Sequence, residues 1–85
     1  MNKYIFILSI ASSLCISKSS MTIPQLADLL NQNGFTTSYG TLYQGGRGTY
    51  RLISVTYDWL VLDGKQTEAD KVAKAFTKPD GSYAY

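Results

Sequence analysis

Apolar positions recur at helical spacing directly after Met21. Thr22 and Gln25 have the spacing of a capping box, in which the threonine oxygen accepts an early helix N–H and the glutamine reaches back. Gly34 stands where a left-handed residue commonly ends a helix. The pattern therefore predicts a helix over residues 23–33. Its apolar face consists of Ile23, Leu26, Ala27 and Leu30.

Residues 49–62 fit two patterns. Read as a strand, every second residue from Ile53 to Val61 is β-branched or aromatic. Read as a helix, one stripe of the segment is apolar, and it consists of Tyr50, Ile53, Tyr57, Leu60 and Val61. Strands usually have about 5–6 residues, whereas this segment reaches Asp63-Gly64 without an interior turn signal. We favour the helix, and the strand is the alternative.

A further apolar stripe predicts a helix that starts at Thr67, as its cap, and ends before Pro79. The stripe consists of Ala69, Val72, Ala73 and Phe76. Lysines in its later turns suit the negative end of the helix dipole, and these are Lys71, Lys74 and Lys78. Asp80-Gly81 predicts a turn before a short tail.

Small and polar residues separate the first two predicted helices. Residues 36–44 predict an extended or hairpin-like connection around Gly40, and Gly45-Gly46-Arg47-Gly48 predicts a tight turn. The expected fold is mainly α, a small three-helix domain with a short extended connection and a tail. The alternative is an α+β domain with residues 49–62 as a strand. The expected core consists of Ile23, Leu26, Leu30, Phe35, Ile53, Tyr57, Trp59 or Leu60, Val72 and Phe76.

Residues 1–20 differ from the rest of the chain. Lys3 gives a positive start, Tyr4 to Ile16 is apolar with interspersed serines, and Ser17-Lys18-Ser19 is a small-x-small site. This is the layout of a secretory signal peptide, and the apolar stretch is shorter than the roughly 20 residues that span a bilayer. Met21 offers the other interpretation, an over-extended reading frame whose true start is internal.

The two interpretations of residues 1–20 differ in location. A cleaved signal peptide implies an exported protein, periplasmic or secreted, and a start at Met21 implies a cytoplasmic one. In both, residues 21–85 form a single small domain.

The composition removes several kinds of chemistry. The 85 residues include one cysteine and no histidine, which excludes an internal disulfide, the usual zinc sites and every Ser-His or Cys-His nucleophile. The carboxylates are scattered, so we expect no enzyme, no metal and no cofactor. From Met21 onward six basic residues balance six acidic ones, because Lys3 and Lys18 precede it. Nucleic-acid or membrane affinity would therefore depend on local charge placement.

One segment carries a family resemblance. Its motif is Ala27-x-x-Leu30-Asn31-x-x-Gly34-x-x-Thr37-x-x-Gly40, with Tyr43 at a following aromatic position. About residues 26–60 resemble the helix-turn-helix-like part of the recombinase domain of large serine recombinases. The resemblance implies a small DNA-binding or accessory protein of a mobile-element, prophage-like gene set. The catalytic serine domain of that family is absent, so recombination is not implied.

The residues also suggest where DNA would bind. Basic and hydroxyl side chains at the start of the second helix are Arg47, Thr49 and Arg51, and the preceding connection adds Thr36, Thr37 and Tyr39. The alternative is that Arg47 and Arg51 are solvated surface charges or pair with Asp58 or Glu68.

The alternative function is an exported protein that contacts a protein partner through aromatic surface residues. The tyrosines that we consider for this surface are Tyr39, Tyr43, Tyr50, Tyr83 and Tyr85. The oligomeric state stays open.

Overall fold

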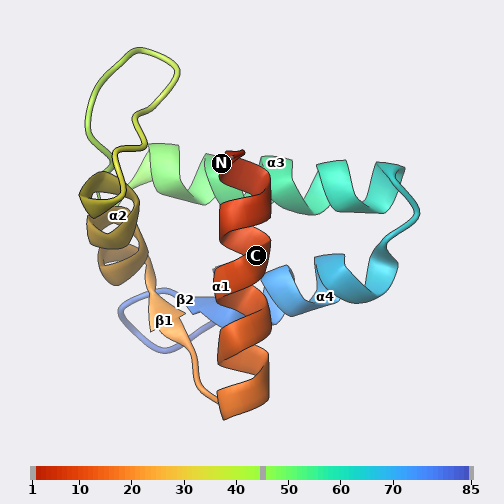
Figure 1. Ribbon diagram of the computed structural model, residues 1–85. Coiled ribbons are helices and arrows are strands. Elements are labelled where there is room, and N and C mark those ends of the chain that lie inside the picture. The colour runs from red at the N-terminus through yellow and green to blue at the C-terminus, as the bar shows by residue number, and fades with distance from the viewer. Residues whose placement is uncertain (1, 45, 85) are drawn as a thin grey trace.

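The computed structural model describes residues 2–44 and 46–84. Its elements are α1 (Lys3–Ser17), β1 (Met21–Thr22), α2 (Ile23–Gln32), α3 (Arg47–Leu62), α4 (Gln66–Ala75) and β2 (Phe76–Thr77). Figure 1 shows α3 and α4 as an antiparallel pair, with α1 crossing both and α2 beside the start of α3. The prediction of a mainly α fold is confirmed, and residues 3–17 add a helix to the three expected.

The segment 49–62 is helical, so the strand alternative is wrong. Side chains at helical spacing point into the core, including Ile53 and Leu60. Thr56 lies wholly buried between them, and its hydroxyl donates to the carbonyl of Leu52 at 2.7 Å. This bond within the helix satisfies the hydroxyl, so a threonine can face the core.

Helix α2 has the ends that the sequence predicts. The Gln25 N–H donates to the Thr22 hydroxyl at 3.4 Å, and the Thr22 N–H donates to the Gln25 side chain at 3.0 Å. Gly34 is left-handed with φ +81°, and the Phe35 N–H donates to the Leu30 carbonyl at 3.1 Å. This is a Schellman ending, and the capping box and the left-handed stop are both confirmed.

Helix α4 differs from its prediction at both ends. A Schellman ending of α3 at Gly64 leads directly into α4, whose cap is Lys65, so Thr67 lies inside the first turn. The helix stops at Ala75 because Phe76–Thr77 pairs in parallel with Met21–Thr22. The predicted extension to Pro79 is therefore wrong, and Lys78 lies beyond the helix.

The predicted glycine turn is also corrected. Arg47 and Gly48 belong to the first turn of α3, and Gly46 is its N-cap. Gly45 lies outside the described residues. Gly46 and Gly48 therefore lie at the start of α3 and do not form a separate turn.

Helix α1 shares its core with the other helices. Ile7 and Ala11 are wholly buried in one cluster with residues of α2, α3 and α4. Two ring contacts flank them, Tyr4 with Trp59 at 5.2 Å and Phe6 with Phe35 at 4.8 Å between centroids.

The signal-peptide and over-extended-start interpretations of residues 1–20 stay predictions. Within the described residues, no helix is long and apolar enough to cross a membrane.

The expected core is largely present. Its wholly or almost wholly buried members are Ile23, Leu26, Leu30, Ile53, Leu60, Val72 and Phe76. Phe35, Tyr57 and Trp59 are half-buried and pack against this cluster. Phe35 and Trp59 lie at its edge because their rings contact aromatic side chains of α1.

Replacing Ile7 tests the packing of α1. Ile7→Ala should lower the free energy of unfolding by about 2–5 kcal/mol, because it removes buried methyl groups and leaves a cavity. Ile16→Ala is the matched control on the same helix, since Ile16 is 84% exposed, and it should change stability by less than about 0.5 kcal/mol. Urea unfolding of the full chain measures both. Equal effects of the two substitutions would mean that α1 does not pack into the core.

Candidate nucleic-acid interface

A groove of about 1130 Å³ lies where three segments meet. Its lining comes from the first residues of α1, from the loop formed by residues 37–44, and from the first turns of α3. In Figure 1 this loop projects beyond α2, next to the start of α3. We call this feature the α3 groove.

The α3 groove collects four of the six predicted DNA-binding residues. Thr37, Tyr39, Arg47 and Arg51 all line it. Thr36 is exposed next to it, and its carbonyl accepts a hydrogen bond from the Lys3 ammonium. Residues from the loop and from the helix therefore line one groove, and their role as DNA contacts stays a prediction.

Thr49 requires a correction. Its side chain is wholly buried, and its hydroxyl donates to the carbonyl of Gln44 at 2.6 Å. This bond ties the end of the loop to α3 and leaves no surface for a ligand. Thr49 is thus a structural residue and not a DNA contact.

The two arginines of the α3 groove carry uncompensated charge. Arg47 and Arg51 are exposed and one helical turn apart. Across residues 2–44 and 46–84 the salt bridge that forms is Lys65 with Asp63 at 3.3 Å, so neither arginine pairs with Asp58 or Glu68. No Asp or Glu side chain is found in the groove lining within residues 2–44 and 46–84. The described lining therefore carries positive charge from Lys3, Arg47 and Arg51, although the chain as a whole has a net charge of only +2.

The backbone at the start of α3 is open. Gly46 is the N-cap, and no side-chain hydrogen bond caps this end. A Cβ atom added at Gly48 would meet only the Thr37 methyl group, at 3.8 Å. Helix N-termini attract anions through their free N–H groups and dipole. Together with the arginines, this end can hold a phosphate oxygen.

Two contacts that the sequence analysis missed hold the loop in place. The Asn31 side chain and the Tyr43 backbone exchange two hydrogen bonds, both of 2.8 Å. The Lys3 ammonium donates to the Tyr43 hydroxyl at 2.9 Å and lies 5.3 Å from its ring centroid. Asn31 and Tyr43 both belong to the motif that resembles serine recombinases, so the sequence did mark these two residues. No sequence signal relates Lys3 to residues so far along the chain.

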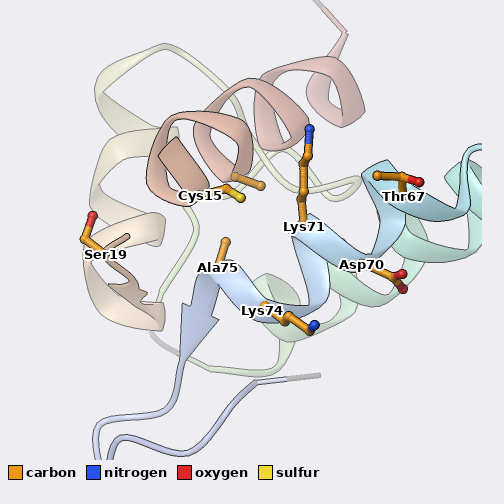
Figure 2. A pocket seen from close by; sticks show the side chains of 8 residues that line it. Cys15, Ser19, Thr67, Asp70, Lys71, Lys74 and Ala75 are labelled. Atoms are coloured by element: carbon orange, nitrogen blue, oxygen red, sulfur yellow. The ribbon is translucent and has the colours of Figure 1, made fainter. Parts of the chain in front are cut away.

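A second hollow, of about 300 Å³, shares no residue with the α3 groove. Figure 2 shows it between α1 and α4, with Cys15 from the first helix and Lys71 and Lys74 from the second. Cys15 is a free, exposed thiol. No described group of three or more cysteine and carboxylate side chains is placed to hold a metal ion.

One carboxyl group has a shifted pKa, and it lies outside both hollows. The Ser82 hydroxyl and backbone N–H donate to Asp80, which lowers the pKa of its carboxyl group. These bonds fix the exposed turn after β2.

The tyrosines expected at the surface divide into two groups. Tyr39 and Tyr83 are exposed, Tyr50 is half-buried and Tyr43 is buried beneath Lys3. Tyr85 lies outside the described residues.

No protein-family model matches the chain, and neither a curated protein nor a solved structure matches it. The similarity of residues 26–60 to serine recombinases therefore stays a prediction from the motif.

Replacing Asn31 tests how the loop is held. Asn31→Ala should lower the free energy of unfolding by about 1–3 kcal/mol, because it leaves backbone groups of the buried Tyr43 without partners. Asn33→Ala removes an exposed amide that bonds within its own helix turn, so it should cost less than about 1 kcal/mol. Denaturant titration compares the two variants. A smaller loss for Asn31→Ala than for Asn33→Ala would contradict this account of the loop.

Proposed function

We propose that this protein binds DNA through the α3 groove. The observation that carries the proposal is the pair of exposed arginines, Arg47 and Arg51, in a groove whose described lining contains no Asp or Glu. Arginine binds phosphate oxygens through a planar fork of donors, and an unpaired arginine is free to do so.

The contacts divide into two kinds. Arg47, Arg51 and the open start of α3 suit the phosphate backbone, which positions a protein on DNA without reading its sequence. The exposed side chains of Tyr39 in the loop and of Thr36 just before it can add polar or base contacts. Only two or three phosphates would be neutralised, so we expect modest affinity and a salt dependence with a slope of about −2.

The proposal rests on the α3 groove rather than on a helix-turn-helix. Residues 33–46 connect α2 and α3, whereas a helix-turn-helix has a turn of about 3–4 residues. An accessory role in a mobile-element gene set depends on the motif resemblance of residues 26–60 alone, and it stays a prediction.

A protein partner is the second candidate. Tyr39 and Leu42 are 91% and 64% exposed on the lining of the same groove. Exposed aromatic and aliphatic side chains that lie together favour contact with another protein. This candidate requires no contribution from the arginine charges, so removing those charges distinguishes it from DNA binding.

A double arginine substitution tests the DNA proposal. Arg47→Ala with Arg51→Ala should weaken binding to a labelled DNA oligonucleotide by about tenfold or more and flatten the salt slope by about 2. Fluorescence anisotropy at low salt measures both quantities.

The matched control is Lys74→Ala with Lys78→Ala. It removes the same charge from exposed residues that do not line the α3 groove, so binding should change by less than twofold. Equal losses from the two double variants would show non-specific charge attraction. Absence of any binding by the unmodified protein would refute the proposal and favour the protein partner.

A further inference from the structure

We propose that the α3 groove takes unpaired DNA, with one base stacked on the ring of Tyr39. The inference rests on the proposed function and narrows it from DNA in general to a single strand or an unpaired end. It is carried by the exposure of Tyr39, the hydrogen bonds within its turn and the position of the loop beside the start of α3.

The Tyr39 ring is left open to solvent. It is 91% exposed, whereas the described aromatic pairs, Tyr4 with Trp59 and Phe6 with Phe35, join rings at the edge of the core. Nucleic-acid bases stack on such exposed rings regardless of sequence, because every base has a π-face. In a duplex those faces are covered by neighbouring base pairs, so only an unpaired base can stack fully on a protein ring.

The turn that carries Tyr39 is already ordered. The Thr37 hydroxyl accepts from the N–H of Tyr39 at 3.3 Å and from the N–H of Thr41 at 3.2 Å. The Thr37 N–H donates to the Thr41 carbonyl at 2.9 Å, and Gly40 adopts the positive φ of +77° that the turn requires. Binding therefore loses little conformational entropy in this turn, and the ring is displayed before a ligand arrives.

The charges of the α3 groove fit a strand that lies along it. Tyr39 lines the groove together with Arg47 and Arg51, and Leu52 and Val55 add apolar surface. A single strand offers bases and phosphates to these two kinds of surface at once. Among the described residues, no Asp or Glu side chain lines the groove, so none of them opposes the phosphates there.

The loop also opposes a duplex. A helix with its side chains is about 10–12 Å wide, and the major groove of B-DNA is about 12 Å wide. The loop of residues 37–44 projects beside the start of α3 and lines the α3 groove together with the first turns of that helix. Because one helix already fills that width, the projecting loop opposes entry of the start of α3 into the major groove.

The test compares single-stranded and duplex DNA on the full chain. The probes are a fluorescein-labelled, mixed-sequence oligonucleotide without self-complementarity and the same oligonucleotide annealed to its complement. The proteins are the unmodified chain, Tyr39→Ala, Tyr39→Phe, and the double variant Arg47→Ala with Arg51→Ala. Circular dichroism establishes that each variant is folded, which we expect because all three side chains are exposed.

We expect the unmodified chain to bind the single strand more tightly than the duplex. Tyr39→Ala should weaken single-strand binding about tenfold, in the range for loss of one base–aromatic stack, and should weaken duplex binding by a smaller factor. Tyr39→Phe keeps the ring and should bind within about twofold of the unmodified chain. The double arginine variant should weaken binding to both probes.

Two results separate the failure of this inference from failure of the proposed function. Duplex binding as tight as single-strand binding, or a Tyr39→Ala variant with unchanged single-strand affinity, overturns the inference and leaves arginine-dependent DNA binding in place. Absence of binding to either probe, or binding that the double arginine variant retains, overturns both.

Discussion

The packing of α1 across α3 and α4 is the contact on which the rest of the structure depends. Ile7 and Ala11 lie wholly buried at this crossing. Because α1 is fixed there, its first residues reach the loop, where Lys3 bonds to the Tyr43 hydroxyl and the Thr36 carbonyl. The hydrophobic contact of one helix thus positions a polar contact on the α3 groove. A chain without residues 1–20 would lose both at once and would expose apolar surface on α3 and α4.

The α3 groove combines a loop that is held by hydrogen bonds with two arginines that form no ion pair among the described residues. Its loop is held by hydrogen bonds from three residues, which are Asn31, Lys3 and the buried Thr49. Arg47 and Arg51, in contrast, have no ion-pair partner among the described residues. A protein that stabilises the backbone of a groove and leaves its cations unpaired has a surface prepared for an anion. This division of roles underlies the proposal that the groove binds DNA.

Local signals in the sequence predicted local structure well. The capping box of Thr22 and the stop at Gly34 are set by neighbouring residues, so the bounds of α2 followed from a short window. The end of α4 did not, because the pairing of Phe76 with Met21 joins distant segments. The same limit applies to the site. The arginines were visible as charges at a helix start, whereas the burial of Thr49 and the reach of Lys3 depend on tertiary packing that no window of sequence contains.

The packing of α1 into the core of the domain carries Lys3 to the α3 groove. Native-state hydrogen exchange of the full chain tests it most directly, since amides within one cooperative unit open together. If α1 packs in this way, the amides around Ile7 and Ala11 are protected to nearly the same free energy as those around Ile53 and Leu60. Exchange of the α1 amides at unprotected rates, while α3 stays protected, would contradict it.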